Sequence, residues 1–376
     1  MSTNKMNILY VEPYYSGSHK SWIDQYLNVT SHSIRILSLP GNKWKWRIHG
    51  GAITLAEKLN SKNLALDLII CSDFVNLPVF KSLLNQKYKN LPIVMYFHEN
   101  QITYPWSPHD KDKQLKRDLH YHFINYSSSL VSDYNYFNSN YHFKSYIDGL
   151  KKYLKKMPDF NNYKTIDIIT TKSKVLNIGC DLDKFEKYKF SRDNSIPIIL
   201  WNHRWEFDKN PDDFFKILFE LKKDKIEFKL VVLGEKFDNY PPIFDKAKDI
   251  LNNEIIAFEY VKSFNTYAKW LWKCDILPVT SNQDFFGISI IEASFCNTIP
   301  ILPNRLSYPE IFDKKSNPEL FYENNKSLKN KLKRYLNDHN YKKSYINRDL
   351  KKFDWNNIKK NYDSEFEKIA IKYKKK

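Results

Sequence analysis

Two carboxylates stand close together where a strand is expected to run into a helix. Asp284 and Glu292 have seven residues between them, and Gly287 lies where the helix should begin. The first N–H groups of a helix lack backbone partners and carry partial positive charge, so they can hold a phosphate. The segment predicts a phosphate site at Phe286, Gly287 and Ile288, with Glu292 placed to reach a ribose. The alternative is an ordinary turn with two solvated carboxylates.

Two basic residues form a second candidate group. Arg204 and Lys209 come directly after the apolar run 198–201, which is expected to be a strand. A planar guanidinium and a compact ammonium together suit a departing diphosphate. A surface turn that carries two bases is the alternative, but the position after a strand favours a site.

The N-terminal half holds a glycine loop and a basic aromatic segment. Gly17 lies in a short donor-rich stretch before an expected helix, which is weak evidence because many turns look alike. The expected loop 40–51 contains Lys43, Trp44, Trp46 and Arg47. Indole rings that alternate with cations suit unpaired nucleotides. The alternative is that the tryptophans pack beneath the domain while the charges face water.

A third segment follows a later expected strand and reads Tyr-Phe-His-Glu-Asn-Gln, with His98, Glu99 and Asn100 as its polar residues. Ligands of parallel sheets bind at the carboxyl ends of the strands. We therefore expect these residues at a site, with a core histidine bonded to a carbonyl as the alternative for His98.

Composition limits the class of protein. A chain of 376 residues is long for one core and suits two. Four scattered cysteines without a CxxC pair argue against a zinc site or disulfide framework and fit a reducing cytoplasm. No apolar run is long enough to span a membrane, and no signal peptide is recognised. The net charge of +17 favours a polyanionic partner, although biased lysine usage explains it equally well.

Strands that alternate with helices predict an α/β protein with two parallel, doubly wound sheets. We place a first domain at residues 1–190, a second at 191–350, and a C-terminal helix with a lysine-rich tail at 351–376. The expected strands are Asn7–Glu12, Ser33–Leu39, Leu66–Cys71, Ile93–His98, Leu130–Phe137, Val175–Ile178, Ile198–Trp201, Phe228–Leu233, Ile255–Tyr260, Asp275–Val279 and Thr298–Leu302. The expected helices include Asp212–Lys222, Tyr267–Lys273, Gly287–Phe295 and Trp355–Lys374.

Several of these motifs resemble a known family. The two spaced acids with the Arg/Lys pair resemble the retaining glycosyltransferases of family 4, although that family usually has Glu where this chain has Asp284. The Gly-Ser-His-Lys, Lys-Trp-x-Trp-Arg and Phe-His-Glu-Asn-Gln segments, together with residues 137–139 and 307–312, resemble the tRNA-queuosine mannosyltransferases. This resemblance covers nearly the whole chain.

The resemblance implies a GT-B fold, in which two Rossmann-like domains face a cleft and a C-terminal helix crosses back to the first domain. It implies transfer of mannose, with retention and without a metal or other cofactor, from GDP-mannose to the cyclopentenediol of queuosine in the anticodon of tRNA(Asp). The implied partners are thus a nucleotide sugar and a tRNA, in the cytoplasm and without membrane insertion.

The resemblance also implies roles for residues. Arg204 and Lys209 would neutralise the diphosphate, and His98 would face the sugar, so that these three and Asp284 are the catalytic candidates. The donor-binding candidates are Gly17, Arg204, Lys209, Tyr260, Phe285, Phe286, Gly287, Ile288 and Glu292. The acceptor-binding candidates are Lys43, Trp44, Trp46, Arg47, Glu99 and Asn100.

Two other functions stay open. A family 4 transferase could use another acceptor, such as a lipid or a polysaccharide, which a basic amphipathic membrane helix would support. A tRNA-binding protein whose transferase site has decayed would explain Asp284, but retention of Arg204, Lys209, Gly287 and Glu292 speaks against it.

Overall fold

The computed structural model describes residues 5–108, 110–115, 117, 119–237, 239–337 and 348–374. Packing divides the chain into two compact units: unit 1 is Met1–Cys180 with Trp355–Lys376, and unit 2 is Asp181–Asp354. The first boundary lies after Cys180, ten residues before the boundary expected from the sequence. Residues 181–190 go with unit 2 because Phe185 is buried edge-on against Phe264 and accepts a hydrogen bond from the Trp272 indole at 2.8 Å.

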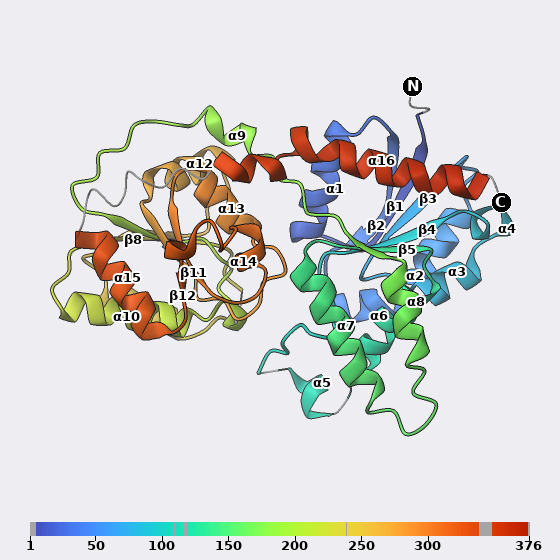
Figure 1. Cartoon of the computed structure of the whole chain (residues 1–376), viewed down its shortest axis with the longest axis horizontal. Coiled ribbons are helices and arrows are strands. Elements are labelled where there is room, and N and C mark those ends of the chain that lie inside the picture. The colour runs from blue at the N-terminus through green and yellow to red at the C-terminus, as the bar shows by residue number, and fades with distance from the viewer. Residues whose placement is uncertain are drawn as a thin grey trace. The chain divides into compact units, whose positions relative to one another are not determined.

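Unit 1 is built on a six-stranded parallel sheet in the order β2-β1-β3-β4-β5-β6 (Figure 1). Its strands are β1 (Asn7–Tyr15), β2 (Ser33–Pro40), β3 (Leu68–Ser72), β4 (Ile93–Phe97), β5 (Tyr134–Phe137) and β6 (Ser173–Val175). Its helices are α1 (Gly17–Val29), α2 (Trp44–Asn60), α3 (Leu77–Leu83), α4 (Gln86–Lys89), α5 (Lys111–Gln114), α6 (Leu119–Val131), α7 (Asn140–Leu154), α8 (Lys164–Thr171) and α16 (Trp355–Lys374). Helices α1 and α16 cover one face, and α2, α3, α6, α7 and α8 cover the other.

The C-terminal helix α16 belongs to unit 1, as expected. Its buried stripe recurs at helical spacing, as an amphipathic helix requires. Trp355 lies so close to Gly179 that a Cβ on that glycine would come within 2.3 Å of the indole. The Tyr362 hydroxyl lies 2.9 Å from the Tyr96 hydroxyl and accepts from the Trp22 indole at 3.3 Å. The last helix therefore completes the core of the first unit.

Three expectations for unit 1 are wrong. The strand expected at Val175–Ile178 lies earlier, as β6 at Ser173–Val175. The run 130–137 was expected to be one strand, but helix α6 continues to Val131 and β5 begins only at Tyr134. Short apolar runs do not distinguish a strand from the end of a buried helix. The stretch 40–51 was expected to be a loop, but α2 begins at Trp44, because the N–H groups of Trp46 and Arg47 already donate to the Lys43 carbonyl.

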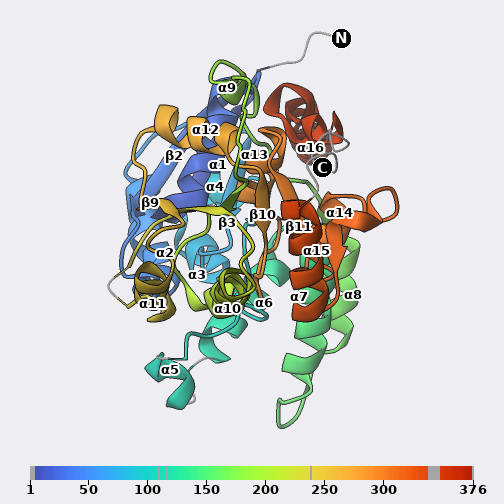
Figure 2. The ribbon, with the colours of Figure 1, turned by 90° about the vertical axis from the view of Figure 1, so that its left-hand side faces the viewer.

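Unit 2 holds a second six-stranded parallel sheet, in the order β12-β11-β10-β7-β8-β9, and Figure 2 labels β9, β10 and β11 of this sheet. Its strands are β7 (Ile198–Trp201), β8 (Lys229–Leu233), β9 (Ile255–Glu259), β10 (Ile276–Pro278), β11 (Ile299–Pro303) and β12 (Phe321–Tyr322). Its α-helices are α9 (Asp183–Glu186), α10 (Pro211–Lys223), α11 (Ile243–Ile250), α12 (Phe264–Lys273), α13 (Ile288–Phe295), α14 (Tyr308–Ile311) and α15 (Asn325–Asn337). Short 3-10 turns lie at Phe207–Lys209, Pro318–Leu320 and Arg348–Phe353. The predicted fold class, two parallel sheets flanked by helices, is confirmed.

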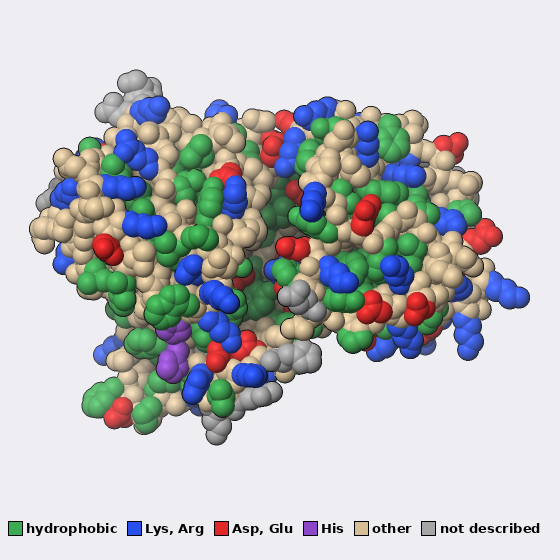
Figure 3. All heavy atoms as spheres, turned by 180° about the vertical axis from the view of Figure 1, so that it is seen from behind, with side chains coloured by type: hydrophobic (Ala, Val, Ile, Leu, Met, Phe, Trp, Pro, Cys, Tyr) green, Lys and Arg blue, Asp and Glu red, His purple; other side chains and the backbone are tan. Residues whose placement is uncertain are grey.

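On the face seen in Figure 3, basic side chains are not gathered in one patch. Lysine and arginine side chains outnumber acidic ones, in line with the net charge of +17, and on the face seen in Figure 3 they are spread widely. Net charge alone therefore does not locate a site. Among the described residues, none of the helices combines the length and apolarity that crossing a membrane requires.

Candidate functional site

The turn before α13 is shaped by glycine and by two buried aromatic rings. Gly287 has φ +94° and caps the helix in the left-handed region, where a side chain would be strained. Phe285 and Phe286 are buried, and Phe286 packs edge-on against Phe353. The rings anchor the turn, so the backbone at the start of this eight-residue helix is fixed as a set of N–H donors.

Lys209 and Asp284 come together beside this turn. The Lys209 ammonium donates to the Gln283 carbonyl at 2.7 Å and lies 3.9 Å from Asp284 Oδ2 and 3.2 Å from Asp208 Oδ2. Burial opposes the charge on Lys209, but the carboxylates of Asp284 and Asp208 outweigh it and raise the pKa of the lysine. Asp284 also accepts a hydrogen bond from the Tyr308 hydroxyl at 3.1 Å. Lys209 is therefore held in place and positively charged beside Asp284.

Arg204 and Glu292 occupy different environments. The Arg204 guanidinium is about half exposed and lies 3.0 Å from Glu206 Oε2, so it remains accessible to an anion. Glu292 lies within α13 and accepts a hydrogen bond from the Tyr267 hydroxyl at 2.9 Å. Burial raises the pKa of Glu292. Tyr260 is exposed and follows the edge strand β9, separated from β7 by β8.

Two residues that the sequence reasoning missed join the loop after β7 to α13. Asn202 donates to the Ser289 carbonyl at 2.8 Å, and His203 Nδ1 lies 3.4 Å from the Ser289 hydroxyl. Burial and the neighbouring Lys209 lower the pKa of His203 to about 3, so the imidazole is neutral. Gly234 is required here because a Cβ would lie 2.0 Å from the His203 carbonyl oxygen. The signal in the sequence that could have identified Asn202 and His203 is their position as polar residues directly after a buried strand.

A cluster of buried titratable groups occupies the carboxyl edge of the sheet in unit 1. Glu12 is fully buried and accepts hydrogen bonds from the Tyr10 hydroxyl at 3.0 Å, the Tyr14 N–H at 2.8 Å and His19 Nδ1 at 2.8 Å. Burial opposes protonation of His19, but the Glu12 and Asp73 carboxylates raise its pKa to about 9. The His19 imidazole is therefore positively charged at neutral pH, and its Nδ1–H donates a hydrogen bond to Glu12.

His98, a predicted site residue, stands in this cluster. Its backbone N–H donates to Asp73 Oδ1 at 2.8 Å. Its ring atom Nε2 lies 3.3 Å from the Tyr10 hydroxyl, and its ring centroid lies 4.3 Å from that of His19. Burial and the charge on His19 lower the pKa of His98 well below its usual value, so this ring is neutral. Burial raises the pKa of Asp73 to about 8. The charge on His19 lowers this pKa, whereas the nearby carboxylates of Glu99 and Glu12 raise it further.

Several buried polar atoms of this edge have no hydrogen-bond partner among the residues that the structure describes, including His98 Nδ1, Asp73 Oδ2 and Asn100 Nδ2. Buried polar atoms are nearly always satisfied, so three together indicate a place for a polar ligand. The side-chain oxygen Oδ1 of Asn100 is already used, since it accepts from the backbone N–H groups of Ile102 and Thr103 at 3.1 and 2.9 Å. Tyr10, Glu12, His19 and Asp73 were not predicted, although each is a polar residue in or near the end of an apolar strand.

The predicted acceptor segment is the first turn of α2 rather than a loop. Trp44 is half-buried against Phe74, Trp106 and Tyr121, with ring centroids 5.2–6.3 Å apart. Trp46 is 65% exposed and lies over Gly50, where a Cβ would come within 2.6 Å of the indole.

Four other predicted residues of unit 1 already have roles of their own. The Arg47 guanidinium is held by the Pro40 carbonyl at 3.2 Å and Asn42 Oδ1 at 2.9 Å. Glu99 accepts from the Gln101 amide at 2.9 Å. Gly17 begins α1 with φ +51°, and Lys43 caps α2 with φ 54°.

Each of the two units matches a known family of protein domains. Residues 7–180 match the N-terminal domain of tRNA-queuosine alpha-mannosyltransferase, and residues 183–352 match the glycosyl transferases of group 1. The tRNA-queuosine alpha-mannosyltransferase of Drosophila melanogaster is 32% identical over 342 residues, covering 88% of this chain and 87% of the relative.

Solved structures share the fold at low identity. Sucrose-phosphate synthase from Thermosynechococcus elongatus has a TM-score of 0.71 at 12% identity, over 98% of this chain and 100% of that one. An E. coli structure described as trehalose-6-phosphate bound with UDP-2-fluoro glucose has a TM-score of 0.68 at 11% identity, over 96% and 99%. The protein is therefore a glycosyltransferase with the GT-B fold. Within that class, the chain belongs to the tRNA-queuosine alpha-mannosyltransferase family.

Proposed function

We propose that this enzyme transfers mannose from GDP-mannose to the cyclopentenediol of queuosine in the anticodon of tRNA(Asp), with retention at the sugar. The observation that carries the proposal is the family relationship over both units, joined to a preset cationic site in unit 2. The donor nucleotide, the acceptor tRNA and a cytoplasmic location are parts of the proposal.

The donor half of the reaction is assigned to unit 2. The Lys209 ammonium, the Arg204 guanidinium and the N-terminus of α13 meet the negative charge that grows on the departing diphosphate. These groups take the role that a metal ion would otherwise fill. Asp284 keeps Lys209 charged and in place and contacts the sugar with the backbone of the turn, while Glu292 binds the ribose hydroxyls.

The acceptor half is assigned to the carboxyl edge of the sheet in unit 1. The neutral His98, Asp73 and Asn100 offer one acceptor or donor each, which suits a pair of neighbouring hydroxyls. In the step itself, the bond between mannose C1 and the phosphate oxygen breaks, and a bond from C1 to one hydroxyl oxygen forms on the same face. The hydroxyl proton passes to the departing diphosphate, so no carboxylate nucleophile is required.

A matrix of donors and acceptors tests the proposal. The purified enzyme is incubated with GDP-mannose, GDP-glucose or UDP-glucose, and with tRNA(Asp) that carries either queuosine or guanosine at the modified position. We expect sugar on RNA only with GDP-mannose and queuosine. Equal transfer to guanosine-containing tRNA, or a preference for a UDP-sugar, would contradict the assignment. Transfer to a lipid or polysaccharide in place of tRNA would do the same for the acceptor.

A further inference from the structure

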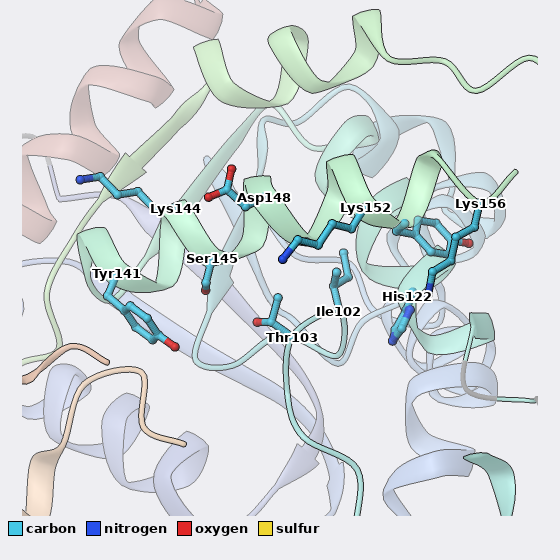
Figure 4. Close-up of a pocket in the computed structure, with 11 residues that line it drawn as sticks. Ile102, Thr103, His122, Tyr141, Lys144, Ser145, Asp148, Lys152 and Lys156 are labelled. Atoms are coloured by element: carbon cyan, nitrogen blue, oxygen red, sulfur yellow. The ribbon is translucent and has the colours of Figure 1, made fainter. Parts of the chain in front are cut away.

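Helix α7 carries a row of lysines along one side of a surface hollow. The hollow has a volume of about 610 Å³, and its lining includes Lys144 and Lys152 from α7 and Lys156 just after its end, with Ile102, Thr103 and His122 opposite (Figure 4). Residues four apart lie above one another on a helix, so Lys144, Asp148 and Lys152 form one row along α7, which Lys156 follows. In the close-up, Lys152 extends toward Thr103 and Lys156 toward His122.

A second hollow of about 540 Å³ lies on the other side of the same row. Its lining includes Lys151 and Lys152 from α7, Lys155 at the C-terminal cap of that helix, and Lys164 from α8. Lys152 borders both hollows, so the two are parts of one surface. We call this surface the lysine band: Lys144, Lys151, Lys152, Lys155, Lys156 and Lys164.

The charge of the lysine band is largely unbalanced. Lys151 lies 3.3 Å from Asp148, while the other five lysines form no ion pair with any residue in the described part of the chain. Lys329 on α15, by contrast, contacts both Glu220 and Asp224, at 2.7 and 3.0 Å. The band therefore offers five ammonium groups that no carboxylate among the described residues pairs with and that an anion can contact.

The band is joined to the buried cluster by direct contacts. Asn138, just before α7, donates to the His98 carbonyl at 2.8 Å, and its own side-chain oxygen lies 2.9 Å from His142 Nδ1 in the first turn of the helix. On the other wall of the hollow, Ile102 and Thr103 donate to Asn100 Oδ1. Both walls are therefore fixed to the edge at which His98 and Asn100 stand.

We propose that the lysine band binds the phosphate backbone of the tRNA next to the nucleotide being modified. The inference rests on the proposed function, because it names the surface that holds that substrate. A chain of phosphates matches an extended row of unpaired ammonium groups, whereas a single small anion would leave most of them unused. A membrane surface fits less well, because the apolar face of α7, with Tyr146, Ile147 and Leu150, is buried in unit 1 and the lysines border hollows.

The test compares two triple variants with a matched control. Lys144→Gln/Lys152→Gln/Lys156→Gln and Lys151→Gln/Lys155→Gln/Lys164→Gln remove three charges each from the band. The control Lys223→Gln/Lys246→Gln/Lys248→Gln removes three exposed lysines from unit 2. Affinity for queuosine-containing tRNA is measured against salt concentration, together with GDP affinity and melting temperature.

Each lysine that contacts a phosphate contributes about 0.7–0.9 to the slope of log affinity against log salt. We expect the first variant to lower the magnitude of the slope by about 2–3 and the second by about 1–3. The control should keep the wild-type slope, and GDP affinity should stay unchanged in all variants. Band variants whose slope and affinity equal those of the control would overturn the inference.

Two further readings separate the inference from the function on which it rests. If the band variants lose binding to anionic phospholipid vesicles while their slope of log tRNA affinity against log salt is unchanged, the band binds a membrane and the RNA assignment is overturned. Wild-type enzyme that binds tRNA through the band and yet transfers no mannose to queuosine would contradict the proposed function and leave the docking surface in place. If the wild-type enzyme transfers mannose and both band variants keep its full activity and tRNA affinity, the docking surface alone is contradicted.

Discussion

His19 Nδ1 donates a 2.8 Å hydrogen bond to Glu12 Oε2, and both side chains are buried at the carboxyl edge of the sheet in unit 1. This pair places a positive charge directly against the ring of His98, whose centroid is 4.3 Å away. Because the neighbouring imidazolium disfavours a second charge, His98 stays neutral and can serve as a hydrogen-bonding group toward a ligand.

Stability should fall as pH rises above neutrality. His19 has a pKa raised from 6.5 to about 9, so its contribution is fully present below pH 6.5 and is lost as pH rises through 9. Asp73 has a pKa raised from 3.8 to about 8, so the folded state binds its proton more tightly than the unfolded state does. Ionisation of Asp73 therefore also lowers stability as pH rises between these values. We expect a loss on the order of 3 kcal/mol between pH 6.5 and 9, measured by urea unfolding.

Glu12→Gln is the variant that examines the cause of this pH dependence. Without the carboxylate, the pKa of His19 should fall and the slope of stability against pH should flatten. Glu57→Gln, an exposed carboxylate on α2, serves as the control and should keep the wild-type slope. A wild-type protein that gains stability from pH 6.5 to 9, or a Glu12→Gln slope equal to that of wild type, would show that the pair is not charged as described.

Arg204→Ala should weaken transfer through the donor. The substitution removes at least one charged hydrogen bond to the diphosphate, worth roughly 1.5–3 kcal/mol, so turnover should fall by about tenfold or more. Arg35→Ala, an exposed arginine on β2, is the control and should leave turnover unchanged. Normal turnover of Arg204→Ala at both saturating and low donor concentrations would rule out its contact with the diphosphate.

The two acids should separate transfer from nucleotide binding. Asp284→Asn keeps the shape but removes the charge that faces Lys209, so it should mainly lower transfer, whereas Asp284→Glu keeps the charge. Glu292→Gln should mainly weaken GDP binding, because its proposed target is the ribose. Calorimetry with GDP alone, beside the transfer rate, distinguishes them. Abolished GDP binding in Asp284→Asn with intact binding in Glu292→Gln would mean that the roles are reversed.

The two tryptophans at the start of α2 should behave differently. Trp44 packs in an aromatic cluster, so Trp44→Ala should cost about 2 kcal/mol and lower the melting temperature by about 4–8 °C. Trp46 exposes most of its ring, so Trp46→Ala should leave the melting temperature unchanged. If unpaired bases stack on Trp46, tRNA affinity should fall by the equivalent of about 1–3 kcal/mol. A Trp46→Ala protein with normal tRNA affinity would remove this ring from the acceptor site.

The sequence predicted those elements whose signal is local. Strand Ile198–Trp201 and helix Trp355–Lys374 were placed at their observed bounds, because an isolated apolar run and a helical stripe are complete within their own segments. The start of α2 is not predicted because its first turn, Trp44 to Arg47, alternates indoles with cations and lacks a side-chain cap, so no local signal marks a helix at Trp44.

The candidate site was predicted in part for the same reason. Lys209, Asp284 and Gly287 belong to motifs, and the structure brings them together around one turn. The cluster of Glu12, His19 and Asp73 depends on the order of strands β1, β3 and β4 in the sheet, which places residues from distant segments against His98. Their charges follow from mutual burial, which spacing along the chain does not reveal.

The most direct test of the account is mass spectrometry of tRNA nucleosides after the enzyme has acted. Queuosine-containing tRNA(Asp) is incubated with GDP-mannose and either wild-type enzyme or Lys209→Ala, then digested to nucleosides. The account predicts that queuosine is converted to a species heavier by one hexose with wild-type enzyme and far more slowly with the variant. Unmodified queuosine after prolonged incubation with folded, GDP-binding wild-type enzyme would contradict it.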